Sequence, residues 1–193
     1  DVATATAKDV IEEKMNTSIE WQMPTLVNGD KEVIQWSERT GWAHLYRYTA
    51  EGELVNQITK GEWHVSNVLG VDDAKRVIYF TATGYNKDEN PYYLHLFRVN
   101  YDGSGLKQLD PKDFNGEFSL SDDRRYFVTT YSRANAAPVS ELYTVEGKKV
   151  MTLAEVDLEP LFAMGYQYPE PFVVKAADGV TDLHGVMFKP YDF

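Results

Sequence analysis

The sequence repeats His44-Leu45-Tyr46-Arg47-Tyr48 as His95-Leu96-Phe97-Arg98-Val99 and, more loosely, as Leu142-Tyr143-Thr144-Val145. Each copy follows an apolar strand pattern and precedes a turn with an acidic residue and a glycine: Glu51-Gly52, Asp102-Gly103 and Glu146-Gly147. The matching leucines are 51 and 46 residues apart. A period of about 40–50 residues with several strands per repeat is typical of the blades of a β-propeller.

Each repeat is expected to contain four antiparallel strands in a meander. The opening strands align through Gly61-Glu62-Trp63 and Gly116-Glu117-Phe118. Each opening strand ends in a turn rich in Asp, Asn, Ser or Gly, which favours a hairpin: Asn28-Gly29-Asp30, Val71-Asp72-Asp73 and Ser121-Asp122-Asp123. The link between the second and third strands varies most, and its polar residues, Gly and Pro indicate surface loops at 39–42, 84–91 and 133–138.

The pattern therefore predicts an all-β fold, a partial β-propeller of about three complete four-stranded antiparallel blades over residues 23–154. Residues 1–22 are expected to finish a preceding blade, with a strand at 10–14. Residues 155–193 are expected to form a connector, with one helical turn, and a C-terminal β-hairpin that turns at Asp178-Gly179. Because a closed propeller needs roughly four to eight blades, we interpret the chain as part of a larger protein.

The composition agrees with strands and excludes some classes of partner. Aromatic residues make up 13% of the chain, which suits rings packed between stacked sheets. A formal charge of −11 argues against a nucleic-acid partner, because phosphate binding needs clustered Lys and Arg. The chain has no cysteine, so neither disulfides nor thiolate metal sites are expected.

Three stretches of the chain resemble one family of enzymes. They are Trp36-Ser37-Glu38-Arg39-Thr40-Gly41-Trp42-Ala43-His44-Leu45-Tyr46, then Gln57-Ile58-Thr59-Lys60-Gly61-Glu62-Trp63, and last Lys175-Ala176-Ala177-Asp178-Gly179 with Leu183-His184-Gly185-Val186-Met187. In this order they resemble the dipeptidyl-peptidase IV family of prolyl-oligopeptidase-type serine peptidases. The resemblance implies that residues 1–153 are the later part of a propeller. It also implies that residues 165–193 lead to an α/β-hydrolase domain outside this chain.

The resemblance transfers no catalytic residue to this chain. Enzymes of this family carry the nucleophilic serine on a G-x-S-x-G elbow, and none of the eight serines has that context. The nearest is Ser104, which has Asp102 and Leu106 where the pattern needs glycines. The acidic pair that binds the substrate amino terminus in this family belongs to an earlier propeller segment. We therefore assign no catalytic, cofactor-binding or metal-binding residue, and we expect no cofactor.

Several polar residues could be assigned a chemical role, but a structural role explains each of them better. His44 and His95 occupy the same repeat position, which indicates a shared structural role. The acidic pairs Asp72-Asp73 and Asp122-Asp123 recur at one turn, so hairpin formation explains them better than acid–base catalysis. The pattern Asn86-x-Asp88-x-Asn90 begins like a calcium loop but lacks the following glycine and the final glutamate.

Two pairs of large side chains are open to more than one interpretation. Trp21 and Trp42 are expected to pack between blades, although a tryptophan in a loop could also face a cavity or a neighbouring domain. Arg39 and Arg133 each follow a polar residue at the end of a second strand. They are either surface ions or side chains that hold loop carboxylates.

The preferred hypothesis is a non-catalytic propeller segment of a dipeptidyl-peptidase IV-like serine exopeptidase, in which the propeller limits and shapes access of a peptide substrate. The alternative is a stand-alone propeller scaffold that binds a protein or glycan partner; a propeller enzyme acting on sugars ranks last. The expected partners are the hydrolase domain and, through it, a peptide substrate. Exposed blade faces predict self-association of the chain. By resemblance, we expect a periplasmic, extracellular or membrane-anchored setting.

Overall fold

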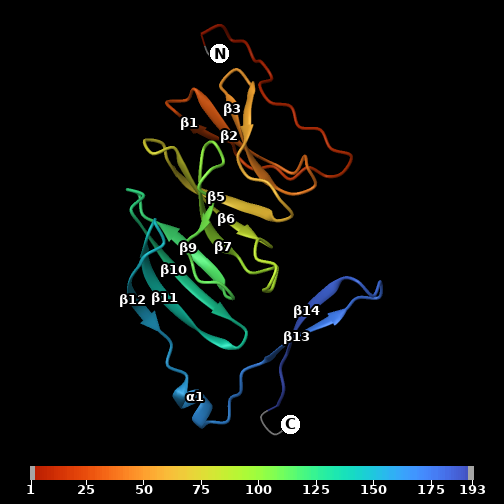
Figure 1. Cartoon of the computed structure of the whole chain (residues 1–193), viewed down its shortest axis with the longest axis vertical. Coiled ribbons are helices and arrows are strands. Elements are labelled where there is room, and N and C mark those ends of the chain that lie inside the picture. The colour runs from red at the N-terminus through yellow and green to blue at the C-terminus, as the bar shows by residue number, and fades with distance from the viewer. Residues whose placement is uncertain (1–2, 191–193) are drawn as a thin grey trace. The chain divides into compact units, whose positions relative to one another are not determined.

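The computed structural model describes residues 3–190. Three four-stranded antiparallel sheets follow one another along the chain, and in each the strands pair in sequence order (Figure 1). A two-stranded hairpin comes last. The prediction of an all-β fold with three propeller-type blades and a terminal hairpin is therefore confirmed.

The blades are named here by their order along the chain. Blade 1 contains β1 (Thr25–Val27), β2 (Glu32–Ser37), β3 (His44–Thr49) and β4 (Leu54–Gln57). Blade 2 contains β5 (His64–Asp72), β6 (Val77–Thr83), β7 (His95–Asn100) and β8 (Lys107–Gln108). Blade 3 contains β9 (Asn115–Leu120), β10 (Tyr126–Arg133), β11 (Ala136–Thr144) and β12 (Lys149–Glu155).

The repeated turn after the third strand requires glycine. Gly52, Gly103 and Gly147 have φ angles of 94°, 87° and 83°, a region that side chains with a Cβ rarely adopt. A Cβ on Gly103 would also lie 2.7 Å from the carbonyl oxygen of Ile58. The acidic-glycine pairs of the sequence are thus explained by backbone conformation.

The chain folds as two compact units. Among the described residues, unit 1 comprises those up to 85 and those at 96–108, and unit 2 comprises those at 86–95 and those from 109 onward. Blade 1 and most of blade 2 belong to unit 1. Blade 3, the hairpin and the segment between β6 and β7 belong to unit 2.

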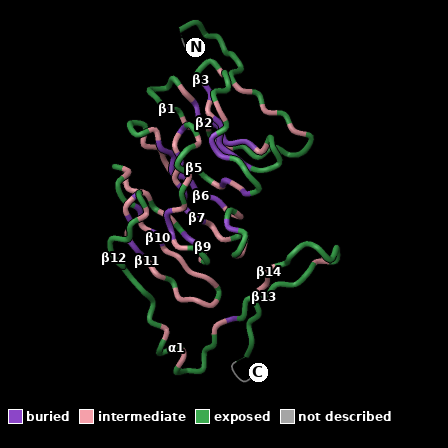
Figure 2. The backbone as a smooth tube through the Cα atoms, viewed as in Figure 1, coloured by how far each residue is buried: buried purple, intermediate pink, exposed green. Residues whose placement is uncertain are grey.

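The core of unit 1 is aromatic and lies between its two sheets. Trp63 is stacked with Phe80 and Phe97, with ring centroids 6.2 Å from each. The indole of Trp36 donates a hydrogen bond of 2.7 Å to the carbonyl of Val65, which ties β2 to β5. Figure 2 shows the buried residues concentrated in these strands. This arrangement confirms that the aromatic strands of neighbouring repeats pack against each other.

The segment before blade 1 differs from the expectation. Residues 10–14 form no strand; they contact blade 1 through side chains, with Ile11 against the cluster of Val33, Tyr46 and Tyr48. Apolar residues at this segment therefore reflect packing onto a sheet and not pairing within one. Trp21 and Trp42, expected between blades, are 68% and 43% exposed.

In unit 2, blade 3 is followed by α1 (Glu159–Ala163) and the hairpin of β13 (Glu170–Lys175) and β14 (Asp182–Met187). The single helical turn and the hairpin turn at Asp178-Gly179 were both predicted. The β10–β11 connection is shorter than the predicted loop at 133–138, because β11 already begins at Ala136. Every residue of β12, β13 and most of β14 is exposed. No helix within residues 3–190 has the length and apolar character needed to cross a membrane.

Candidate functional site

Three parts of blade 3 meet at one end of its sheet, which we call the connector end. The start of β9 lies there, because Asn115 pairs with Ser132 near the end of β10. The end of β12 lies there too, because Glu155 pairs with Val139 of β11. The β10–β11 turn and the exit of the chain toward α1 and the hairpin therefore share this end.

The segment between β6 and β7 is attached to the connector end by three hydrogen bonds, each with a main-chain N–H as the donor. The N–H of Leu94 donates to the Asn115 side chain, and the N–H of Gly116 donates to the Leu94 carbonyl, both at 3.0 Å. The N–H of Asp113 donates to Oε2 of Glu89 at 2.6 Å. A variable loop is thus held in place by the residues just before β9.

The buried side chain of His95 anchors the segment between β6 and β7. Nδ1 of His95 lies 2.7 Å from Oδ2 of Asp110, and its Nε2 lies 2.7 Å from Oε1 of Glu89. The side chains of His95 and Asp110 are 1% exposed, and that of Glu89 is 6% exposed. Glu89 also accepts a hydrogen bond of 2.6 Å from the Asn86 amide. Glu89 is therefore the hub that joins the loop, β7 and the segment before β9.

The two carboxylates make His95 a structural cation. Burial by itself lowers the pKa of His95, but the hydrogen bond and charge of Asp110 and the charge of Glu89 together raise it above the ordinary value. Both ring nitrogens contact a carboxylate, so neither is available as a base for a hydroxyl nucleophile. The group Glu89–His95–Asp110 consequently positions the loop and does not resemble a catalytic triad.

Arg133 continues this network to the β10–β11 turn. Its guanidinium forms an ion pair with Asp113, whose main-chain N–H binds Glu89, and its Cζ lies 5.1 Å from the centre of the Phe114 ring. Of the two interpretations offered for the arginines, holding a loop carboxylate is therefore the correct one for Arg133. Arg39 does the same in unit 1, where it forms an ion pair with Glu13.

A cavity of about 700 Å³ lies at the connector end within unit 2. Its wall combines the loop between β6 and β7, the β10–β11 turn and the hairpin. Among the lining side chains are Tyr92, Tyr93, Arg133, Asn135, Phe172 and His184. Burial, together with the nearby charge of Asp113, raises the pKa of Tyr93, so this phenol stays protonated and keeps a hydrogen-bond donor.

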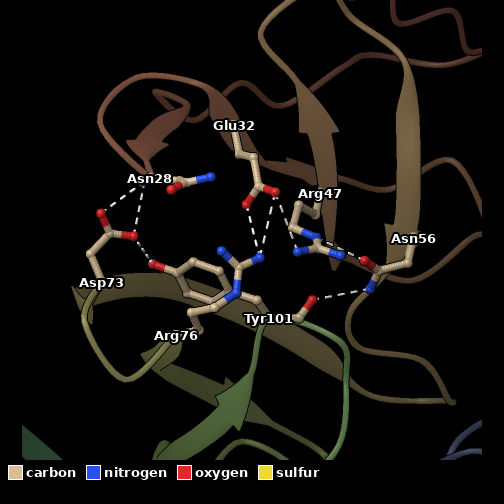
Figure 3. Close-up of polar contacts among 7 residues, drawn as sticks. All are labelled: Asn28, Glu32, Arg47, Asn56, Asp73, Arg76 and Tyr101. Atoms are coloured by element: carbon tan, nitrogen blue, oxygen red, sulfur yellow. Dashed lines mark hydrogen bonds and ion pairs between the residues drawn. The ribbon is translucent and has the colours of Figure 1, made fainter.

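In unit 1, a polar cluster joins blade 1 to blade 2 (Figure 3). Glu32 of β2 contacts Arg47 of β3 at 3.5 Å and Arg76 of the β5–β6 turn at 3.0 Å. Asp73 accepts hydrogen bonds from the N–H of Asn28 at 2.8 Å and from the hydroxyl of Tyr101 at 3.1 Å.

The two residues of the acidic pair Asp72-Asp73 have different structural roles. Asp72 accepts a hydrogen bond of 3.0 Å from the N–H of Lys75 inside the hairpin, as predicted, whereas Asp73 bonds to the neighbouring blade. In the later turn, Asp123 accepts from the N–H of Arg125 at 3.1 Å. Hairpin formation therefore accounts for one residue of the first pair, and blade association accounts for the other.

The remaining residues singled out from the sequence also have structural surroundings. His44 is buried and bonds to Thr59 and Gly61, and Ser104 donates a hydrogen bond of 2.7 Å to Asp102 in its own turn. Among residues 3–190, no group of three or more His, Asp or Glu side chains could hold a metal ion. Glu89 and Asp110, the central carboxylates of the site, were missed. For Asp110 the signal was the 15-residue spacing that separates both His44 from Thr59 and His95 from Asp110, whereas Glu89 had no such signal.

Comparison with known proteins now identifies the family. A family model described as the dipeptidyl peptidase IV (DPP IV) N-terminal region matches residues 1–138. The chain belongs to the dipeptidyl peptidase IV family. A dipeptidyl peptidase 4 of Trichophyton rubrum is 34% identical over 163 residues, which cover 80% of this chain and 20% of the relative. The corresponding protein of Arthroderma otae is 35% identical over 125 residues, 64% of this chain and 16% of the relative.

Solved structures agree with the family assignment at the level of the fold. The crystal structure of Porphyromonas gingivalis dipeptidyl peptidase 4 matches 95% of this chain and 26% of its own, with a TM-score of 0.77 and 22% identity. A putative dipeptidyl aminopeptidase IV from Bacteroides ovatus matches 91% of this chain with a TM-score of 0.68 and 26% identity. The chain spans about a fifth of the curated relatives that it matches. It is therefore a propeller segment from the N-terminal region of a DPP IV-like protein.

Proposed function

We propose that this segment limits and shapes the access of peptides to the active site of a serine-type aminodipeptidase whose catalytic triad lies outside the chain. One observation carries the proposal. The chain leaves β12 at the same end of blade 3 that holds the loop between β6 and β7, the β10–β11 turn and the cavity. The part of the protein that follows the connector is thus joined to the connector end of blade 3, which carries the loop between β6 and β7 and the β10–β11 turn.

The proposed partner of the connector end is an α/β-hydrolase domain that follows the hairpin. The hairpin exposes apolar side chains on both strands, among them Phe172 at 41%, Val173 at 54% and Leu183 at 49% exposure. An exposed apolar sheet of this kind is typical of a surface that another domain covers. The substrate proposed for the complete protein is a peptide with a free amino terminus.

The test has two parts. The purified chain is expected to release no dipeptide from a chromogenic dipeptide substrate, because it contains no G-x-S-x-G elbow. The coding sequence is expected to continue after residue 193 into such an elbow, followed by Asp and His. A stop codon at that position would contradict the proposal and favour the alternative of a stand-alone scaffold that binds a protein or glycan.

We also propose that the isolated chain associates with itself through unit 1. A groove of about 730 Å³ on this unit is lined by apolar side chains, including Val10, Ile19, Trp21 and Leu26. Replacing Trp21 by Asp should shift the chain toward the monomer in sedimentation experiments, whereas the matched change of the exposed Trp42 to Asp should not. A monomer over a wide concentration range for the unmodified chain would contradict the proposal. For the complete protein we propose a periplasmic, extracellular or membrane-anchored setting.

A further inference from the structure

The chain contains Asn-Gly twice, in two short stretches of similar sequence. Val27-Asn28-Gly29-Asp30 and Phe114-Asn115-Gly116-Glu117 both place the pair between an apolar residue and an acidic one. An asparagine before glycine is prone to lose its side-chain amide, because the glycine has no Cβ that would hinder the approach of its main-chain nitrogen. The two stretches have matching local chemistry, so a difference in their reactivity must come from the fold.

The first pair lies in the β1–β2 turn, where its reacting groups are free. Asn28 and Gly29 are both exposed, and a Cβ on Gly29 would meet no atom within 4 Å. The turn is closed by one long hydrogen bond, 3.4 Å from the N–H of Lys31 to the Asn28 carbonyl. Within residues 3–190, neither the Asn28 carboxamide nor the N–H of Gly29 has a hydrogen-bond partner, and Figure 3 draws no contact from this carboxamide to the other residues shown.

The second pair lies at the start of β9, where both reacting groups are bonded. Oδ1 of Asn115 accepts a hydrogen bond of 3.0 Å from the N–H of Leu94, and the N–H of Gly116 donates one of 3.0 Å to the Leu94 carbonyl. Gly116 is buried, and Asn115 pairs with Ser132 of β10. Attack of the Gly116 nitrogen on the Asn115 side chain therefore requires two hydrogen bonds to break and the strand to leave its sheet.

We propose that Asn28 is a site of spontaneous deamidation and that the fold protects Asn115 from the same reaction. The main-chain nitrogen of Gly29 bonds to Cγ of Asn28, the bond from Cγ to Nδ2 breaks, and the Gly29 proton leaves with the amide nitrogen as ammonia. Water then opens the succinimide ring at one of its two carbonyls, which gives aspartate or isoaspartate. Water is the only co-reactant.

The modified residue would lie where blade 1 is joined to blade 2. The N–H of Asn28 donates to both carboxylate oxygens of Asp73, at 2.8 and 2.9 Å, and Asp73 also accepts a hydrogen bond from the Tyr101 hydroxyl. Deamidation adds a negative charge to the residue that contacts this carboxylate, and like charges repel. Isoaspartate also lengthens the main chain of the turn by one carbon. Both changes weaken the link between the two blades.

The test incubates the purified 193-residue chain at neutral pH and body temperature in water enriched in heavy oxygen, and follows both sites by peptide mapping and mass spectrometry. The heavy oxygen marks acid that forms during the incubation. In the folded chain, product should form at Asn28 at least about 10-fold faster than at Asn115, because two hydrogen bonds must first break at the second site. In guanidinium chloride, which unfolds the chain, the two rates should be alike because the local sequences match.

A variant separates the reaction from its effect on the blades. Asn28→Gly removes the amide and tolerates the φ angle of 56° at this position. After the same incubation, the unmodified chain should unfold at a lower urea concentration than before, whereas Asn28→Gly should not change. Absence of product at Asn28, equal rates in the folded chain, or unequal rates in the unfolded chain would overturn the proposed site. An unchanged urea midpoint of the deamidated chain would overturn its role in blade association.

Discussion

Blades 1 and 2 place a histidine at the same repeat position and surround it differently. His44 contacts the hydroxyl of Thr59 at 3.1 Å and the carbonyl of Gly61 at 2.9 Å. His95 contacts two carboxylates, those of Asp110 and Glu89, at 2.7 Å. Both rings are 1% exposed. Equal burial therefore does not give equal charge.

The two environments shift the histidine pKa in opposite directions. Burial is the main cause that lowers the pKa of His44, and its hydrogen bond to Gly61 only partly offsets this effect. For His95 the carboxylates outweigh burial and raise the pKa. In blade 3 the corresponding residue is Glu141, which is buried and pairs with Lys149. The position thus requires a buried polar group, and the neighbouring strands decide its charge.

The largest expected difference between the two blades follows from removing each ring. His95→Leu leaves two buried carboxylates without their cation and should lower the free energy of unfolding by about 3–5 kcal/mol. His44→Leu leaves only a hydroxyl and a carbonyl without a partner and should cost about 1–3 kcal/mol. Urea denaturation of the chain and of both variants measures the difference. Equal losses would mean that His95 is not a buried cation.

A smaller effect on the free energy of unfolding is expected from a change at Glu89, the residue that joins the loop to β7. Glu89→Gln keeps the size of the side chain but removes a charge, and it turns one acceptor for the N–H of Asp113 or the Asn86 amide into a donor. The free energy of unfolding should fall by about 1–3 kcal/mol, and the pKa of His95 should fall with it. Glu117→Gln, an exposed position on β9, is the control and should change stability by less than about 0.5 kcal/mol.

The pH dependence should have opposite signs at the two histidines. The folded chain holds the proton of His95 more tightly than the unfolded chain, so this stabilisation is complete below about pH 6.5 and is lost as the pH rises through the raised pKa. For His44 the unfolded chain binds the proton first. Stability is then lost as the pH falls from about 6.5 through the lowered pKa. NMR titration of both rings checks the order: if His44 titrates at the higher pH, the assignment is wrong.

The smallest effect on stability is expected when blade 1 is made to resemble blade 2. Thr59→Asp gives His44 a carboxylate at the spacing found in blade 2. The pKa of His44 should rise, because the imidazolium gains a carboxylate partner, while stability changes by about 1 kcal/mol or less, because the new ion pair offsets the cost of burying a carboxylate. The reverse change, Asp110→Thr, should lower the pKa of His95. An unchanged pKa of His44 would show that the 15-residue spacing does not define the contact.

The blades were predictable because their signals are local. An apolar strand, an acidic-glycine turn and a second strand recur at a fixed period, and each turn needs a backbone conformation that few residues adopt. The segment at 10–14 was misjudged because an apolar run that packs onto a sheet has the same composition as a strand within one. The wrong length of the loop at 133–138 has a similar cause, since Pro138 lies inside β11.

Residues 86–94 illustrate what local patterns leave open. The sequence marked them as a polar surface loop and drew attention to Asn86, Asp88 and Asn90, whereas the structure makes Glu89 the central residue. Nothing near Glu89 in sequence identifies its role, because His95 is reached through the turn at Pro91 and Asp113 lies beyond β8.

The sequence by itself determined the repeated strands, the blade order, the terminal hairpin and the family, since each depends on residues close together in the chain. Only the tertiary structure decided which buried histidine is charged, which loop is fixed and which side chains share a cavity. These properties depend on residues brought together from separate strands, and electrostatic interactions follow distance in space rather than separation along the chain.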